Sequence, residues 1–177
     1  SDLKAKAQID QDTCVECGNC IRPRTVACPT SSFYELPKEE RSVGRQLRRF
    51  FSDPSTTHPL TGVPGRGTEE VKTNDVTGRV CRGELGICLE MGRPVVGTKV
   101  NEIEKVTMHL AKLGIKLEDN NPLIEMIEDA ATGKFKPEFA EERFVSAIVE
   151  FVVPFDRGRE MLLECKSMAD EVDTVFS

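Results

Sequence analysis

The sequence predicts an α+β protein in which a small cysteine-rich N-terminal domain precedes an antiparallel βαββα sandwich. Four of the seven cysteines lie between residues 14 and 28. Residues 52–75 are rich in Pro, Gly, Ser and Thr, which is typical of a long loop or linker. After this stretch, period-two and helical hydrophobic patterns alternate. We therefore expect a first domain over residues 1–51, a linker over 52–75 and a second domain over 76–177.

The N-terminal region holds weak secondary-structure signals around its cysteines. Residues 5–10 and 31–36 are candidate short strands on either side of the cysteine loop. A helix is expected from Pro37 to about Phe51, because proline at an early helical position and acidic residues in the first turn favour a helix start. Its apolar face would consist of Val43, Leu47, Phe50 and Phe51.

The second half has a clearer rhythm of strands and helices. One long strand or a hairpin is expected over 76–91, strands over 115–117 and 144–155, and helices over 101–113 and 159–176. Two helices on one face of an antiparallel sheet bury these apolar faces economically, which predicts a sandwich of ferredoxin-like topology. A closing strand would have to come after Ser177, so either a partner supplies it or this topology is not the one that forms.

Composition excludes several function classes. The chain of 177 residues carries a net charge of −6, no Trp and one Tyr, which argues against nucleic-acid binding. It has no run of about 18 apolar residues that could span a membrane, and its first residues do not resemble a signal peptide, so we expect a cytoplasmic location. An odd number of cysteines outside a secreted context favours metal or redox chemistry over disulfides.

The cysteines near the N-terminus form the most informative motif. Cys14, Cys17 and Cys20 follow the pattern C-x2-C-x2-C, and Cys28-Pro29 follows after seven further residues. Such spacing lets one loop offer several thiolates, the ligands that iron in clusters requires. Gly18 would permit a positive φ angle where the loop turns tightly.

This segment, about residues 7–36, resembles the bacterial ferredoxins, whose cluster motif is C-x2-C-x2-C-x3-C-P. The resemblance implies one [4Fe–4S] cluster bound by Cys14, Cys17, Cys20 and Cys28. Two departures from the family pattern matter: the gap before Cys28 has seven residues instead of three, and the chain has no second C-x2-C-x2-C run. A second cluster of the family type is therefore not expected.

The identity of the fourth ligand stays open at this point. In two-cluster ferredoxins the cysteine before proline ligates the other cluster, so Cys28 would have to fold back onto its own. Cys81 or Cys88 would be the alternative ligand from the second half, whereas Cys165 lies on the apolar stripe of a helix and is expected in the core. Zinc held by four cysteines is the alternative metal, but such sites usually combine two C-x2-C pairs.

A basic segment follows the cysteine loop. Arg41, Arg45, Arg48 and Arg49 recur at helical spacing and form either a solvated face or a docking surface for an acidic partner. The stretch from Gly62 to Gly67 lacks the Lys-Ser/Thr of a phosphate-binding loop and reads as a flexible connection.

These features predict a single-cluster [4Fe–4S] electron-transfer protein, or a small non-catalytic redox subunit of a larger oxidoreductase complex. We name no catalytic residues, and the electron donor and acceptor would be a larger enzyme or other subunits. The second half is also similar in element order to ACT-type regulatory modules. The alternative is therefore a redox- or ligand-responsive regulator with a sensing cluster. Such a protein could form a homo-oligomer through the sandwich.

Overall fold

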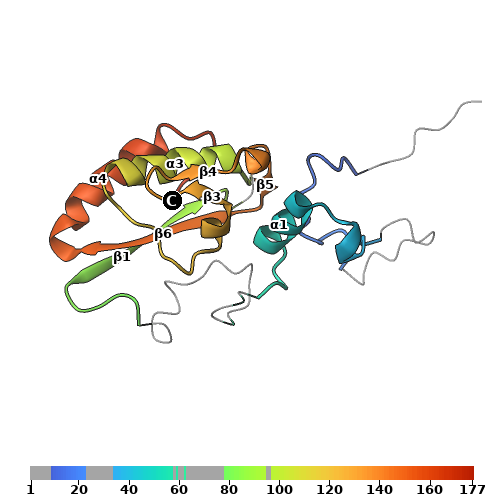
Figure 1. Cartoon of the computed structure of the whole chain (residues 1–177), viewed down its shortest axis with the longest axis horizontal. Helices are drawn as coiled ribbons and strands as arrows, with labels where there is room; N and C mark the ends of the chain where they lie inside the picture. The colour runs from blue at the N-terminus through green and yellow to red at the C-terminus, as the bar shows by residue number, and fades with distance from the viewer. Residues whose placement is uncertain (1–8, 23–33, 58, 60–61, 63–77, 95–96) are drawn as a thin grey trace, which may run out of the picture.

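The computed structural model describes residues 9–22, 34–57, 59, 62, 78–94 and 97–177, which form helices and small antiparallel sheets (Figure 1). The α+β class is thus confirmed. The α-helices are α1 (Val43–Ser52), α3 (Val100–Lys112) and α4 (Gly158–Ala169). The strands are β1 (Glu84–Met91), β2 (Thr98–Lys99), β3 (Ile127–Asp129), β4 (Lys134–Phe135), β5 (Arg143–Phe144) and β6 (Ala147–Pro154). Short 3-10 helices are η1 (Lys38–Glu40), η3 (Pro122–Met126), η4 (Pro137–Phe139) and η5 (Phe155–Arg157).

The central ladder is the antiparallel pair β1 and β6, with Glu84 opposite Pro154 and Met91 opposite Ala147. An isolated bridge joins Leu117 to Phe151 on the far side of β6. Another joins Phe176 to Met91 on the outer edge of β1. The C-terminal segment Val175, Phe176 and Ser177 therefore covers the outer edge of β1. The closing strand expected after Ser177 is thus provided by the chain's own last residues.

The closing contacts are backbone hydrogen bonds. Glu90 and Ser177 exchange two of them, with N to O distances of 2.7 and 3.0 Å, and Gly92 N donates to Val175 O at 2.8 Å. The mutual bonds of the first pair are those of an antiparallel ladder.

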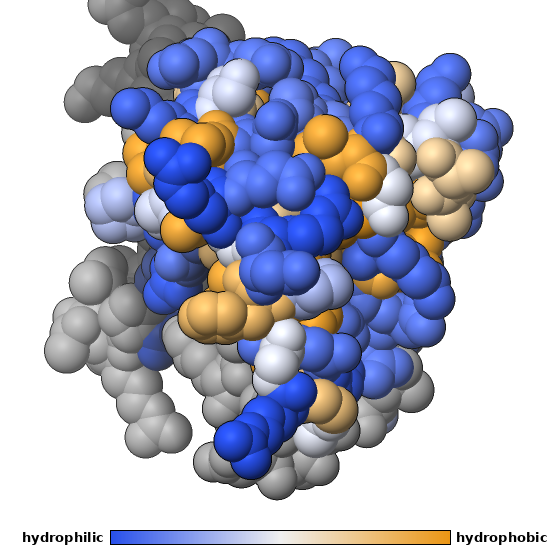
Figure 2. All heavy atoms as spheres, turned by 90° about the vertical axis from the view of Figure 1, so that its left-hand side faces the viewer, coloured by the Kyte–Doolittle hydropathy of each residue, from blue (hydrophilic) through white to orange (hydrophobic). Residues whose placement is uncertain are grey.

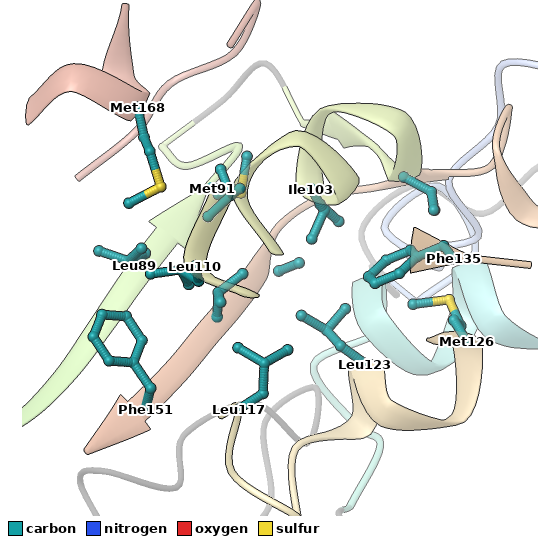
Figure 3. Packing of buried hydrophobic residues seen from close by; sticks show 14 of the residues in the cluster. Leu89, Met91, Ile103, Leu110, Leu117, Leu123, Met126, Phe135, Phe151 and Met168 are labelled. Carbon is teal, nitrogen blue, oxygen red and sulfur yellow. The ribbon is translucent and has the colours of Figure 1, made fainter. Parts of the chain in front are cut away.

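The hydrophobic core lies between the β1–β6 ladder and the helices α3 and α4 (Figure 3). Alternate residues of each strand face the helices because side chains alternate across a sheet. Leu89 on β1 and Phe151 on β6 are buried there against Leu110 of α3 and Met168 of α4. The remaining members of this buried set include Ile87, Met91, Ile103, Val106, Val149, Val153, Met161 and Cys165.

Helix α1 lies against this sandwich beside β5 (Figure 1). The ring of Phe51 is fully buried and stacks on Phe144 of β5, with centroids 4.5 Å apart and an interplanar angle of 26°. Ser52 Oγ accepts a hydrogen bond from Val145 N at 3.0 Å. The end of α1 therefore shares a core with the second half of the chain.

Several expected elements have different boundaries in the structure. The strand expected over 144–155 is divided into β5 and β6, and of the strand expected over 115–117 only Leu117 pairs, in an isolated bridge. The N-terminal helix is divided into η1 and α1, because Ser42 caps α1 by accepting a hydrogen bond from Arg45 N. The strand expected over 76–91 begins only at Glu84, and the last helix ends at Ala169 instead of continuing to Phe176. Val43, expected on the apolar face, is 65% exposed.

Other expectations fall largely outside the described residues. This holds for the strand over 5–10, for part of the strand over 31–36 and for most of the linker over 52–75. Residues 34–36, which are described, form no strand. Among the helices of the described ranges, none has the length and apolar character needed to cross a bilayer.

Candidate metal-binding loop

Cys14, Cys17 and Cys20 lie in one loop that precedes η1 and α1 in the chain. All three are free thiols; Cys14 and Cys17 are half-buried, whereas Cys20 is exposed. Cys28 belongs to the segment 23–33, which lies outside the described residues. The structure thus brings three of the four expected ligands into one surface loop.

The sulfur atoms of these three cysteines are not arranged around a common point. Within the described residues, no group of three Cys, His, Asp or Glu side chains is arranged to hold a metal ion. Cys81, exposed ahead of β1, and Cys88, exposed on β1, therefore form no such group either. Cys88 Sγ lies 3.5 Å from Oε1 of the buried Glu150, and Cys165 is in the core as expected.

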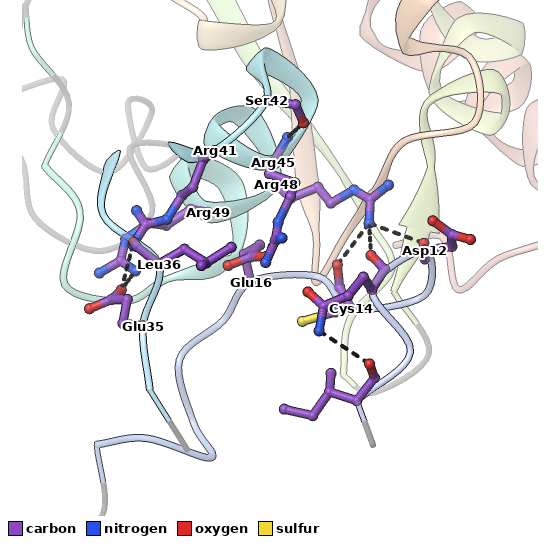
Figure 4. A network of polar contacts seen from close by, with 12 residues as sticks. Asp12, Cys14, Glu16, Glu35, Leu36, Arg41, Ser42, Arg45, Arg48 and Arg49 are labelled. Atoms are coloured by element: carbon purple, nitrogen blue, oxygen red, sulfur yellow. Dashed lines mark hydrogen bonds and ion pairs between the residues drawn. The ribbon is translucent and has the colours of Figure 1, made fainter. Parts of the chain in front are cut away.

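Arg48 of α1 holds the beginning of the cysteine loop (Figure 4). Its Nη1 donates to the carbonyl oxygens of Gln11, Asp12 and Cys14, at 2.9, 3.0 and 3.0 Å. The Nε of the same guanidinium pairs with the carboxylate of Glu142 in the sandwich. One nearly buried cation therefore fixes three loop carbonyls and connects them to the second half of the chain.

Two further arginines hold the middle of the loop. Arg45 Nε donates to Glu16 Oε1 at 2.6 Å. Arg22 Nη2 donates to the carbonyl of Cys17 at 2.9 Å and pairs with the buried Asp53 at 2.5 Å. The Cys14–Cys17 segment is thus restrained by three arginines, all of which follow it in the chain.

The loop backbone is tightly turned. Gly18 has the positive φ angle expected from the sequence, +70°, and Glu16 adopts one of 58°. A positive φ is uncommon for a residue with a side chain, and at Glu16 the ion pair with Arg45 accompanies it.

The directions of the peptide groups fit an anionic ligand. In a trans peptide the N–H points opposite to the C=O, so the peptides that give their carbonyls to Arg48 and Arg22 present their N–H groups on the other side. Among the described residues, the backbone N–H groups from Val15 to Cys20 have no hydrogen-bond partner. Free thiols together with unpaired N–H donors are the chemistry that an iron–sulfur cluster requires of a protein loop. The donor types in the loop are therefore those that such a cluster uses, although the three described thiols are not gathered around one point.

The arginines expected on a docking surface are all engaged within the chain. Arg41 donates to Leu36 O and pairs with Glu35, which Arg49 also contacts (Figure 4). Arg49 pairs with Asp53 as well. Arg45 and Arg48 hold the cysteine loop as described above. A docking role for this helix stays a prediction, but these four side chains already have intramolecular partners.

Sequence reasoning missed the residues that anchor the loop. Arg48, Glu142, Arg22 and Asp53 come from separate parts of the chain and meet only in the folded structure. The signal available in the sequence was the presence of arginines within the cysteine loop, such as Arg22, as well as just after it.

Two clefts lie near α1 and the loop. One of about 640 Å³ lies between α1 and the segment around η3 and is lined by Leu47, Phe50, Pro122 and Ile124, with Arg41 and Arg49 at its polar side. A second, more polar cleft of about 430 Å³ borders the cysteine loop at Thr13 and Val15 and contains Lys99, Asn101, Glu102 and Arg143.

Comparison with known proteins gives no relative. No protein-family model, curated protein or solved structure matches the chain.

Proposed function

We propose that the chain binds one [4Fe–4S] cluster through Cys14, Cys17, Cys20 and Cys28 and acts as a small, non-catalytic electron-transfer protein or redox subunit of a larger oxidoreductase. When bound, such a cluster accepts and releases one electron. The chain's own residues supply thiolate ligands, a fixed loop backbone and N–H donors on the side away from the guanidinium groups.

The observation that carries this proposal is the loop from Cys14 to Cys20. Its thiols are free, its N–H groups are unpaired within the described residues, and its carbonyls at Cys14 and Cys17 are held by Arg48 and Arg22. An ordinary surface loop has no need for a nearly buried cation such as Arg48 on its carbonyls, because water satisfies exposed carbonyl groups. The arrangement is therefore better explained by a bound anionic group than by a plain connection.

The topology that we infer for the second half is ferredoxin-like. From one edge to the other, the paired segments are Phe176, β1, β6 and Leu117, every neighbouring pair being antiparallel. Along the chain the order is β1, α3, the segment at Leu117, β6, α4 and the segment at Phe176. Helix α3 therefore connects the first two paired segments and α4 connects the last two, as a split βαβ arrangement requires.

Redox partners are part of the proposal, because a chain with one cluster needs a donor and an acceptor. We expect a cytoplasmic setting. Apolar side chains that a partner or a second copy would cover include Phe155, Leu162 and Leu163, which are 71%, 61% and 56% exposed on η5 and α4. Figure 2 faces this end of the molecule and shows apolar patches separated by a mainly hydrophilic surface.

The 640 Å³ cleft favours one alternative, a redox- or ligand-responsive regulator. The cleft lies along α1, whose arginines hold the cysteine loop, so a small molecule bound there would contact the helix that supports the cluster ligands. Its volume is in the range of small-molecule sites.

The test that separates the two functions uses protein reconstituted anaerobically with iron and sulfide. An electron-transfer protein is expected to show an EPR signal on reduction with dithionite, to lose it when a one-electron dye reoxidises the protein, and to repeat this cycle with its cluster intact. Loss of the cluster on the first oxidation would contradict electron transfer and support the sensing function.

A further inference from the structure

Arg48 is nearly as buried as a core residue although it is a cation. Its side chain is 11% exposed and is surrounded by loop carbonyls on one side and by Glu142 on the other. A guanidinium removed from water to this degree is stable only when its donors are paired. Here the pairing partners are three peptide groups of the cysteine loop and one carboxylate of the sandwich.

Different nitrogen atoms of the planar guanidinium contact the two sets of partners. Its Nη1 lies within 3.0 Å of the carbonyl oxygens of Gln11, Asp12 and Cys14, while its Nε faces Glu142. Lysine has one point charge and no fork of donors, so it cannot make both sets of contacts in this geometry. The interaction is therefore specific to arginine.

Glu142 is itself fixed in place. Its backbone carbonyl accepts a hydrogen bond from Val100 N at the start of α3, at 3.0 Å. Glu142 also directly precedes strand β5 in the chain. On the α1 side, Gly44 leaves room for the carboxylate, since a Cβ at that position would overlap it. This ion pair thus joins α1 to the sandwich, in addition to the Phe51–Phe144 stack.

We propose that Arg48 is a positioning residue for the cysteine loop, and that Glu142 positions Arg48, so that cluster retention by the N-terminal segment depends on the sandwich. This inference rests on the proposed cluster. Arg48 acts by holding the Cys14–Val15 peptide with its carbonyl toward the guanidinium, which directs the Val15 N–H to the opposite side. It does not itself ligate.

The test compares Arg48→Lys and Glu142→Gln with a matched control, Arg41→Lys. Arg41 lies one residue before the Ser42 cap of α1, its side chain is 8% exposed, and its partners are Glu35 and Leu36 instead of the cysteine loop. Each reconstituted variant is measured for bound iron and sulfide, for the time course of cluster loss to a chelator, and for the midpoint potential. Thermal unfolding of each variant reports whether the sandwich is folded.

We expect Arg48→Lys to weaken cluster retention by about 10-fold or more, the effect typical of residues that orient metal ligands, and to shift the midpoint potential. Glu142→Gln should weaken it in the same direction, and Arg41→Lys should match wild type. Wild-type retention and potential in Arg48→Lys would overturn the positioning role, and wild-type behaviour in Glu142→Gln would overturn the dependence on the sandwich.

Two further readouts keep the test decisive. If Arg48→Lys does not fold, Glu142→Gln still removes a charge from the ion pair while Arg48 stays in place. Amide exchange at Cys14, whose N–H bonds to Asp10 O at 3.0 Å, is measured without the cluster and is expected to be faster in Arg48→Lys. If the wild-type protein binds no cluster, the proposed function is wrong. If amide exchange at Cys14 is unchanged in Arg48→Lys, only the positioning role of Arg48 is wrong.

Discussion

Among the described cysteines, Cys20 and Cys165 differ strongly in solvent exposure. Cys20 is exposed on the N-terminal loop, whereas Cys165 is 8% exposed between α4 and the sheet. Burial raises the pKa of the Cys165 thiol, the neighbouring Glu164 raises it further, and a backbone hydrogen bond only partly opposes them. Because the thiolate is the reactive form, Cys165 should be inert.

This contrast gives a reactivity prediction. In cluster-free, reduced protein treated with iodoacetamide at mildly alkaline pH, Cys165 is expected to be the slowest thiol to be alkylated and Cys20 among the fastest. Mass spectrometry of peptides measures both rates, and all seven cysteines should react alike in denaturant. Equal rates for Cys165 and Cys20 in the folded protein would show that Cys165 is not held in the core.

The fourth cluster ligand is also a question of single residues. We expect Cys28→Ser to abolish a stable [4Fe–4S] cluster after reconstitution, because a cubane needs a thiolate at each corner in this type of site. Cys81→Ser and Cys88→Ser are the controls and should keep full iron and sulfide content. A full cluster in Cys28→Ser together with its loss in Cys88→Ser would assign the ligand to β1 instead.

At the scale of elements, Glu102 connects α3 to the C-terminal segment that closes the sheet. Burial raises its pKa, but hydrogen bonds from Lys105 Nζ at 2.7 Å and from Asp173 N at 2.8 Å outweigh burial and lower the pKa below its ordinary value of 4.5. A lowered pKa in the folded state contributes stability that is present above the ordinary value and is lost as the pH falls through the folded value.

The corresponding prediction concerns acid stability. Between about pH 7 and about pH 3 the wild type should lose more unfolding free energy than Glu102→Gln, because only the wild type carries the carboxylate whose lowered pKa is linked to folding. Urea denaturation at a series of pH values measures the difference. Parallel pH profiles for the two proteins would show that Glu102 does not stabilise this junction.

The success of sequence reasoning differed between helices for a physical reason. The α3 helix was expected over 101–113 and spans Val100–Lys112, because its apolar stripe is regular and Gly114 follows it. The last helix was extended to Phe176 because Val172 and Val175 continue its stripe. The chain instead leaves the helix at Ala169 and pairs with β1, and such long-range pairing overrides a local pattern.

The same limit applies to the candidate site. Cysteine spacing identifies the loop, since chemistry requires the ligands to be close in sequence. Arg48 lies 34 positions from Cys14 and 94 positions from Glu142 along the chain, so no local pattern reveals its role. The anchoring of the loop is a property of the tertiary structure.

At the scale of the whole molecule, α1 and the sandwich share one core through Phe51 and Phe144. Phe51→Ala should therefore reduce the free energy of unfolding by about 3–5 kcal/mol, the usual cost of removing a buried phenylalanine ring. The control is Phe155→Ala, whose side chain is 71% exposed and should change stability by about 0.5 kcal/mol or less.

Denaturation followed by circular dichroism measures both variants. The shared core predicts a single transition in which α1 and the sandwich unfold together, with Phe51→Ala shifting the whole curve. A separate early transition of small amplitude, with the main transition unchanged, would instead make α1 an independent unit.

The central claim is that the cysteine loop carries an iron–sulfur cluster. The most direct measurement is the content of iron, acid-labile sulfide and zinc per chain in protein purified without oxygen. We expect about four irons and about four sulfides, as a single [4Fe–4S] cluster requires, with no stoichiometric zinc. Zinc at about one per chain without sulfide would contradict the claim and make the loop a structural zinc site.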